Sequence, residues 1–316
     1  MAVSGEDLGR FFQTHNARFG KCLEPSMNCP RAPIRAHSIQ NARVIDLLAE
    51  NSHVIALRPD FSDGIPKVKF KSIGRNKAST FTGLCGEHDR SLFAPLDNKP
   101  LDIDDREQLF LLAYRSVTRE LHTVMEGAAK IQSAYSSRVK RGLDPANNPS
   151  PAGILATQQL LNSYFTYLYR SQNFDEALRT RQFDMVEHDV IRLDQPPTLA
   201  VSSLFSLDEI LKDDDIVRVV LNVLPVTDSK TLAIFSYSKE DRAKARSILN
   251  RIFVAQGEYQ KYELSKRILE SIENFLIAPS HFRTWSTEKQ ERIRIAFAST
   301  IMAGTAPAEH ADLMLF

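Results

Sequence analysis

The sequence of 316 residues has only three cysteines and one tryptophan. So few cysteines, without an evident disulfide framework, are typical of a reducing compartment, and we expect a cytoplasmic protein. The first residues, Met1–Asp7, have neither the basic nor the apolar segment of a secretory signal peptide. No apolar run reaches the roughly 18 residues that a membrane span needs, so no membrane association is expected.

Excess charge is also missing, because 40 basic and 39 acidic side chains leave a net charge of +1. The whole molecule therefore has no strong basic field of the kind that attracts nucleic acid. The chain lacks a Gly-x-Gly-x-x-Gly fingerprint and a phosphate-loop lysine motif, so dinucleotide binding and P-loop chemistry are not indicated. Hydrophobic residues make up 43% and charged residues 25%, as in an ordinary globular protein.

The three cysteines that are present fall into two loci, and a histidine completes the second. Cys22 and Cys29 are separated by six residues, and Cys85 and His88 by two. Two close pairs far apart in sequence are how a chain builds a tetrahedral zinc site, with each pair on its own turn. The Cys-x2-His spacing is standard, whereas the Cys-x6-Cys spacing is longer than usual. We predict one structural Zn²⁺ held by these four side chains.

Two alternatives to this zinc site stay open. The cysteines can be unrelated to one another, with two of them buried as small hydrophobic side chains. A disulfide between Cys22 and Cys29 is less favoured, because nothing in the sequence points to an oxidising compartment.

Hydrophobic periodicity predicts an α+β protein. The first part is expected to contain helices over 39–50 and 87–94, strands over 53–57 and 67–73, and a turn over 60–66. The second part is expected to contain helices over 101–141, 153–170, 239–276 and 287–302, and strands over 198–205, 216–226 and 231–237. We therefore predict a zinc-stapled, treble-clef or ββα-like module over 1–100, followed by a mostly helical domain with a small antiparallel sheet over 101–316.

A basic segment follows the first predicted strand. It contains Lys67, Lys69, Lys71, Arg75 and Lys77, with no acidic residue among them. On a strand the three odd-numbered lysines share one face, and such a stripe can follow a phosphate backbone of DNA or RNA. Lysines that protect an edge strand from aggregation are an equally good explanation.

Four titratable residues in the second part lack the spacing of a metal site. Glu120, His122, Glu126 and His188 show no pattern such as His-x3-His. We interpret them as solvated surface residues.

Further motifs accompany the cysteine pairs. The segment Ile34–Ile39 (Ile-Arg-Ala-His-Ser-Ile) lies between them, and Leu84–Phe93 (Leu-Cys-Gly-Glu-His-Asp-Arg-Ser-Leu-Phe) contains the second pair. Over roughly residues 20–95 the chain resembles the HNH endonuclease superfamily. Ala36-His37 stands in the place of that superfamily's Asp-His or Ala-His motif, and Leu84–Phe93 in the place of its helix-starting motif.

This resemblance implies a zinc-stapled finger and a metal-dependent nuclease, or a nuclease-derived toxin of bacterial mobile elements or antiviral defence. The rest of the chain resembles a bacterial protein family that brings no activity with it. Two positions differ from the superfamily's usual pattern: Ala36 replaces an acidic ligand, and the nearest asparagine before Cys85 is Asn76.

The residues themselves suit phosphodiester hydrolysis. A neutral histidine can activate water, and His37 lies a few residues past Cys29, where a zinc site can fix its position. Asp89, next to His88, offers hard oxygen to Mg²⁺ or Mn²⁺. Arg35 and Arg90 can contact phosphate. His37 has other possible roles. It can be another zinc ligand, or it can support zinc binding through contact with a ligand. It can also simply be the neighbour of Ser38 at a helix cap.

Three functions remain open from the sequence. The first is an HNH-like nuclease or toxin, with His37 and Asp89 in its active site. The second is a non-catalytic structural zinc module whose α+β part binds a protein or nucleic-acid partner. The third is an enzyme whose site lies wholly in the second part. We favour a zinc protein that acts on or near nucleic acid.

Overall fold

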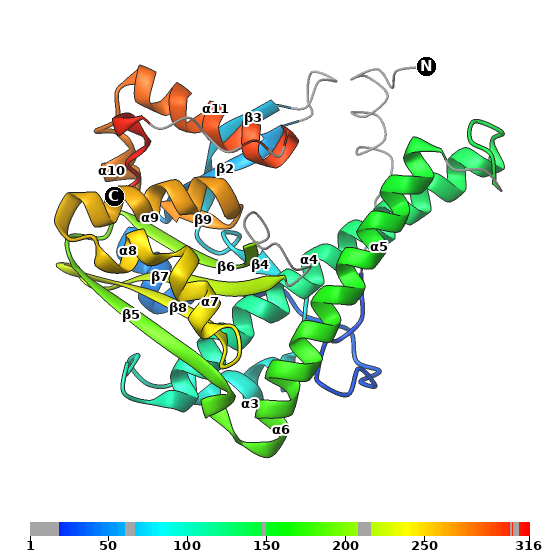
Figure 1. Ribbon diagram of the computed structural model, residues 1–316, viewed down its shortest axis with the longest axis horizontal. Coiled ribbons are helices and arrows are strands. Elements are labelled where there is room, and N and C mark those ends of the chain that lie inside the picture. Colours follow the sequence, from blue (N-terminus) through cyan, green and yellow to red (C-terminus); the bar gives the residue numbers. More distant parts are fainter. Residues whose placement is uncertain (1–18, 61–66, 147–149, 208–215, 304, 306–309) are drawn as a thin grey trace.

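A seven-stranded antiparallel sheet forms the centre of the molecule (Figure 1). In the computed structural model, residues 19–60, 67–146, 150–207, 216–303, 305 and 310–316 are described. The strand order is β3-β2-β9-β6-β7-β8-β5. The strands are β2 (His53–Asp60), β3 (Lys67–Gly74), β5 (Val186–Asp194), β6 (Leu199–Leu207), β7 (Val217–Thr227), β8 (Lys230–Ser238) and β9 (Phe275–Ile277).

The central strands β6 and β7 are buried on both faces. Along β6, Ala200 and Leu204 belong to one hydrophobic core, and Leu199 and Val201 to the other. Successive side chains of a strand point to opposite faces, so a strand with helices on both sides is apolar at nearly every position. This explains why β6 and β7 are nearly continuous apolar runs in the sequence.

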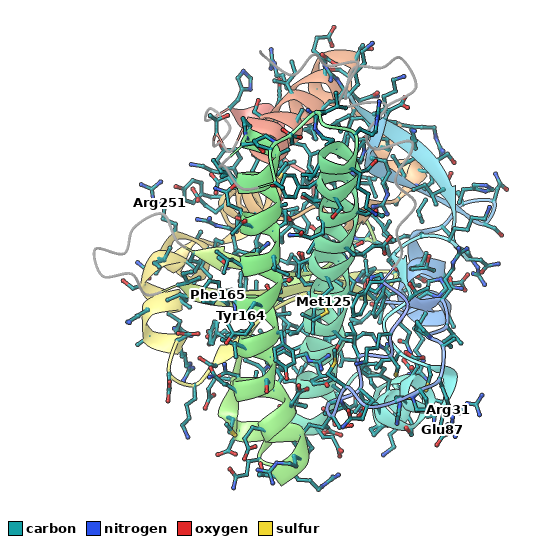
Figure 2. All side chains as sticks on the ribbon, turned by 90° about the vertical axis from the view of Figure 1, so that its right-hand side faces the viewer. Arg31, Glu87, Met125, Tyr164, Phe165 and Arg251 are labelled. Carbon is teal, nitrogen blue, oxygen red and sulfur yellow. The ribbon has the colours of Figure 1, made fainter. Side chains whose placement is uncertain are left out.

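Two long helices cover the first face. The helix α4 (Arg106–Lys140) begins at Asp105, whose side chain accepts a hydrogen bond from the backbone amide of Gln108. Its partner α5 (Pro151–Tyr169) runs beside it in the opposite direction, and the far end of this hairpin extends beyond the sheet (Figures 1 and 2). Of these two helices, α4 makes the larger contact with β6 and β7. The segment after α5 contains η2 (Arg170–Asp175), α6 (Glu176–Thr180) and η3 (Phe183–Met185).

Shorter helices cover the second face. They are α7 (Arg242–Ile248), α8 (Asn250–Val254), α9 (Gly257–Ser271), α10 (Pro279–Phe282) and α11 (Thr287–Ala303), followed by η4 (Ala311–Leu313). The helical region predicted over 239–276 consists of three helices, α7, α8 and α9, because the chain bends twice, and it ends in strand β9. One bend is at Gly257, whose positive φ of 58° suits a residue without a Cβ.

The zinc-ligand loci lie among short elements. They are β1 (Ala36–His37), η1 (Asn41–Ile45), α2 (Asp46–Leu48), β4 (Thr80–Phe81) and α3 (Gly86–Asp97). β1 and β4 form a separate two-stranded antiparallel sheet. The helix predicted over 39–50 is shorter than expected and begins with a π-helical turn. α3 continues through Pro95, which the sequence had placed after it.

The α+β class is confirmed, but the sheet is larger than the small one expected. β2 and β3 precede residue 100 and join the same sheet as the five strands that follow it. The sequence did not predict the edge strand β5, whose charged residues break its apolar pattern, or the three-residue β9. The expected turn over 60–66 lies, apart from Asp60, outside the described residues. Within the described part, no helix combines the length and apolar character that crossing a bilayer requires.

His188 on β5 should make the stability depend on pH. Its Nδ1 lies 2.8 Å from the Ser236 hydroxyl. Burial, with repulsion from Arg106, lowers the pKa of His188 to about 4. In the unfolded chain the pKa is about 6.5, so between these values the unfolded state binds a proton that the folded state does not. Stability should therefore fall as pH falls through this window.

We expect His188→Gln, which keeps a hydrogen-bonding group beside Ser236, to reduce this loss. Thermal unfolding at pH 7 and pH 5 should show a melting temperature that falls less in the variant than in the parent, by on the order of a few degrees. His53→Gln, at an exposed imidazole, is the matched control and should behave like the parent. Equal losses in the parent and His188→Gln would contradict this account.

Candidate metal centre and neighbouring acid–base pair

The four predicted zinc ligands come together in space. The ligating atoms of Cys22, Cys29, Cys85 and His88 all lie within 4.8 Å of one another. His88 Nδ1 is 3.5 Å from Cys22 Sγ and 3.4 Å from Cys85 Sγ, and the sulfurs of Cys29 and Cys85 are 3.9 Å apart. Tetrahedral zinc with its usual bond lengths separates sulfurs by about 3.8 Å, and sulfur from nitrogen by about 3.5 Å. The cluster therefore fits Zn²⁺ closely.

Glu24 organises the long loop between the first two cysteines. Its buried carboxylate accepts hydrogen bonds from the backbone amides of Ser26, Asn28 and Cys29 at 2.9, 2.7 and 3.2 Å. Burial disfavours the charged form, but these bonds and one from the Ser26 hydroxyl outweigh it and hold the pKa of Glu24 below its usual range. The carboxylate thus gives a six-residue spacer a fixed shape, which explains how the unusual Cys-x6-Cys spacing reaches the cluster.

The second locus coincides with the start of a helix. Cys85 immediately precedes α3, and its backbone amide donates to Cys22 Sγ at 3.2 Å. The amide of Leu23 donates to the Gly83 carbonyl at 2.7 Å, and the amide of Ile34 to the Leu84 carbonyl at 2.8 Å. These bonds hold the two loops side by side. The backbone amide of His88 lowers the pKa of Cys85, while burial raises the pKa of Cys22 to about 11, so metal binding should release protons.

A buried arginine connects the cysteine loop to the helical layer. Arg170 is fully buried, and its Nη1 donates to the Leu23 carbonyl at 2.8 Å. Its charge is matched by Asp175, which also accepts a 2.6 Å hydrogen bond from the Tyr114 hydroxyl. Removing one member of such a buried pair leaves the other charge uncompensated. Nothing in the local sequence distinguishes Arg170 from an exposed helical arginine, so its burial could not be predicted.

His37 is not a member of the group of four side chains that could hold the metal. It is the second residue of β1, opposite Thr80 of β4. Its Nε2 is 3.1 Å from the Arg75 carbonyl oxygen, which can only accept, so Nε2 carries the proton. Burial and the positive charge of Arg115 lower the pKa of His37, despite the Arg75 carbonyl and Asp89, which raise it. The neutral imidazole therefore keeps a lone pair on Nδ1.

The position of His37 is fixed by buried polar contacts of the next residue. Ser38 donates from its hydroxyl to the Ser79 carbonyl at 3.2 Å. The same hydroxyl accepts a 3.1 Å hydrogen bond from the side-chain amide of Asn274, which also donates to the Ser202 carbonyl at 2.7 Å. The strand that carries His37 is thus attached to the central sheet.

Asp89 is half-buried in the first turn of α3. Burial raises its pKa, Asp97 adds to this effect, and Arg115 and His37 oppose it. Asp89 and His37 therefore influence each other electrostatically, as expected if they lie in one site. Arg35 and Arg90 are both exposed, and Arg31 pairs with Glu87 at the surface nearby (Figure 2).

The predicted basic segment occupies an edge of the sheet. Lys67, Lys69 and Lys71 are exposed on β3, the terminal strand, and Lys77 is exposed in the turn that follows. Asp60 pairs with Lys69 at 2.6 Å and with Lys71 at 3.5 Å. Arg75 pairs with Asp46. Acidic neighbours thus compensate part of the positive charge.

The interpretation of the four other titratable residues as solvated surface is wrong for His122, Glu120 and His188. His122 is 5% exposed, and its Nε2 lies 3.0 Å from the Thr82 hydroxyl and 3.4 Å from Glu126. Burial raises the pKa of Glu120, which pairs with Arg119. His122 contacts Phe81 and Thr82, and His188 lies beside Ser236. These partners are distant in sequence, so a local pattern does not reveal the burial.

No protein-family model, curated protein or solved structure matches this chain. The function is therefore inferred from the side chains and their geometry.

The purified protein should contain about one Zn²⁺ per chain. Zinc in small structural sites supplies binding free energy on the order of 10 kcal/mol, so His88→Gln should lose most of the metal and unfold at lower temperature. His53→Gln is the matched control, because this exposed imidazole lies outside the cluster. Elemental analysis and thermal unfolding provide the two measurements. Less than a tenth of an equivalent of zinc in the parent would refute the site.

Proposed function

We propose that this protein is an HNH-like, metal-dependent nuclease in which a structural Zn²⁺ fixes the active site. The observation that carries the proposal is the hydrogen bond from His37 to the Arg75 carbonyl. It joins the candidate general base to the end of the basic segment Lys67–Lys77. The order β1, β4, α3 around the four ligands is in keeping with a ββα finger, here with β2 and β3 inserted between its strands.

His37 has the properties of a general base. Its Nε2–H donates to a fixed backbone carbonyl, and its lowered pKa keeps the imidazole neutral near pH 7. The free Nδ1 can then take a proton from a water molecule that attacks phosphorus. The Arg75 carbonyl orients the ring and favours the imidazolium that forms as the proton arrives.

Asp89 supplies the carboxylate for a divalent cation. The Zn²⁺ would have four protein ligands and no open position, so it would hold the fold rather than activate the substrate. A separate Mg²⁺ or Mn²⁺ would polarise the scissile phosphate, and carboxylate oxygen is the ligand that these ions prefer. Because Asp89 follows the ligand His88 on α3, zinc binding sets its direction toward His37.

The basic segment offers a route for the nucleic acid. Its lysines lie along an exposed edge strand, and its last residues contact the strand of His37. A phosphate backbone that follows the lysines would reach His37 and the exposed Arg35 and Arg90. Such contacts bind nucleic acid mainly without sequence specificity.

One observation favours the alternative of a non-catalytic zinc module with a partner-binding part. α5 contains no charged residue, and it exposes six large apolar side chains, of which Tyr164 and Phe165 are labelled in Figure 2. These six are Ile154, Leu155, Leu160, Leu161, Tyr164 and Phe165. An exposed patch of this kind often marks a protein interface. The two functions differ in whether His37 is needed for catalysis.

The basic segment should bind nucleic acid with strong salt dependence. The triple substitution Lys67→Gln, Lys69→Gln and Lys71→Gln should weaken binding to duplex DNA and to RNA at least tenfold at low salt, since each neutralised phosphate releases counterions. Fluorescence anisotropy at several salt concentrations measures both the affinity and its slope.

The matched control changes three exposed lysines elsewhere, Lys140, Lys230 and Lys239, to Gln. It carries the same net charge as the test variant and should bind nearly as well as the parent. Equal binding by the two triple variants would show that the β3 lysines only protect the sheet edge.

His37→Ala should abolish cleavage without loss of zinc. General base catalysis contributes roughly 10²- to 10⁴-fold, so the rate on plasmid DNA or RNA with Mg²⁺ or Mn²⁺ should fall by at least about a hundredfold. Asp89→Asn should lose activity as well and should require more added metal. Cleavage rates, zinc content and thermal unfolding are measured on the same preparations.

His53→Gln serves again as the control and should cleave at the parent's rate. A parent protein with full zinc content and no cleavage with either metal would favour the structural module. Cleavage that survives in zinc-loaded His37→Ala would exclude His37 as the base.

A further inference from the structure

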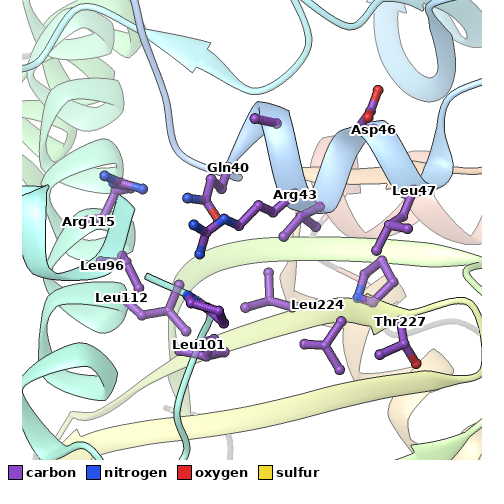
Figure 3. Close-up of a pocket in the computed structure, with 15 residues that line it drawn as sticks. Gln40, Arg43, Asp46, Leu47, Leu96, Leu101, Leu112, Arg115, Leu224 and Thr227 are labelled. Atoms are coloured by element: carbon purple, nitrogen blue, oxygen red, sulfur yellow. The ribbon is translucent and has the colours of Figure 1, made fainter. Parts of the chain in front are cut away.

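A cavity of about 500 Å³ lies near the C-terminal end of α3, the helix whose first turn carries His88 (Figure 3). Its walls come from η1 and α2, from the end of α3 and the segment after it, from α4, and from the end of β7. Small-molecule sites commonly have volumes of about 300–1,000 Å³. Among the residues that line it, neither a zinc ligand nor His37 occurs, so it is distinct from the candidate nuclease site.

Most of the lining is apolar. Leu96, Leu101, Leu112, Leu224 and Val226 contribute aliphatic side chains from four parts of the chain. An apolar wall built from such separate elements suits a ligand with a hydrocarbon body, because burying that body removes its surface from water.

One end of the cavity is polar. In Figure 3 the Arg43 side chain extends along the wall toward Gln40, with Arg115 beyond it. Arg115 is 4% exposed and stacks on the Phe93 ring, 4.1 Å from its centroid. Two nitrogens of Arg115 donate to Asp97 at 2.9 and 2.6 Å. The charge of Arg115 is thus compensated, but its buried Nε has no hydrogen-bond partner among the described residues.

Arg43 is in a different electrostatic situation. Its Nη1 is buried and likewise without a hydrogen-bond partner in the described part of the chain. The only carboxylate among the described lining residues belongs to Asp46, which pairs with Arg75. A buried guanidinium nitrogen is normally paired, because an unmade hydrogen bond to a charged group is costly. Among the described residues, Arg43 therefore places a positive charge without an ion-pair partner beside the apolar lining of the cavity.

We propose that this cavity binds an organic monoanion, a medium-chain or aryl carboxylate. Its carboxylate accepts hydrogen bonds from Arg43 and its hydrocarbon part packs against the leucines. Guanidinium groups bind carboxylates through strong charge-assisted hydrogen bonds. The single charge of Arg43 favours an anion with one negative charge. The apolar lining favours an anion with a hydrocarbon part over a small hydrophilic anion. This inference does not rest on the proposed nuclease function.

Calorimetric titration of the full-length, zinc-loaded protein tests the proposal with three probes. Octanoate should bind saturably with one site per chain. Octanol has the same tail without charge and should bind about ten- to a hundredfold more weakly, the range for a lost charge-assisted hydrogen bond. Acetate has the charge without the tail and should give no detectable binding.

Two substitutions identify the residue. Arg43→Met should weaken octanoate binding by about ten- to a hundredfold. It should not lower the melting temperature, because it replaces a half-buried cation, unpaired among the described residues, by an apolar side chain. Arg43→Gln, which keeps a polar group, should weaken octanoate binding similarly and provides a second test if the Met variant folds poorly. Arg179→Met removes one positive charge at an exposed position on α6 and should bind octanoate like the parent.

The proposal fails if the parent shows no saturable octanoate binding, or if octanol binds as tightly as octanoate. It also fails if the folded Arg43→Met and Arg43→Gln variants bind octanoate like the parent. Because the readout is binding, a protein without nuclease activity can still support it.

Discussion

The convergence of four metal-ligating atoms within 4.8 Å is the constraint on which the first third of the described structure depends. The loop over 22–29 contains no helix or strand, and residues 85–88 form the start of α3. A Zn²⁺ bound by the four side chains would join the two segments, and the free energy of its binding would then be free energy of folding. The same cluster fixes the start of α3. Through α3, the cluster positions Asp89 in the first turn of the helix. It also positions Leu96, which lies near the other end of α3 and lines the cavity.

Buried polar contacts attach this region to the rest of the molecule. Arg170 reaches from η2 to the Leu23 carbonyl, and Asn274 joins Ser38 to β6. Further along the same face, the Ser116 hydroxyl of α4 lies 2.9 Å from both the Ser202 hydroxyl and Asn222 Oδ1. A misplaced partner in such a buried network leaves polar groups unsatisfied, so these networks favour one arrangement of the packed layers. The contacts of Ser38 and Asn274 therefore help to fix the position of His37.

The two proposed sites, one at His37 and Asp89 and the other in the cavity beside Arg43, differ in their electrostatics. Burial lowers the pKa of His37 and raises the pKa of Asp89, so it shifts both groups toward their neutral forms. Arg115 lowers the pKa of both groups, whereas Asp97 raises the pKa of Asp89. Arg115 also borders the cavity and pairs with Asp97, whereas Arg43 has no ion-pair partner among the described residues. The Arg115–Asp97 pair therefore contributes to the electrostatics of both proposed sites.

The sequence by itself determined the features that depend on local chemistry. Ligand type and pairing along the chain identified the four side chains that converge, and helical periodicity located α4 and α5. Alternating or continuous apolar runs located β3, β6 and the β7–β8 hairpin. Only the tertiary structure decided the extent of the sheet, the roles of Glu24 and Arg170, the burial of His122 and the cavity beside Arg43. Each of these depends on contacts between residues far apart in the chain. A side chain's burial and its partner are properties of the packed layers, which no local pattern contains.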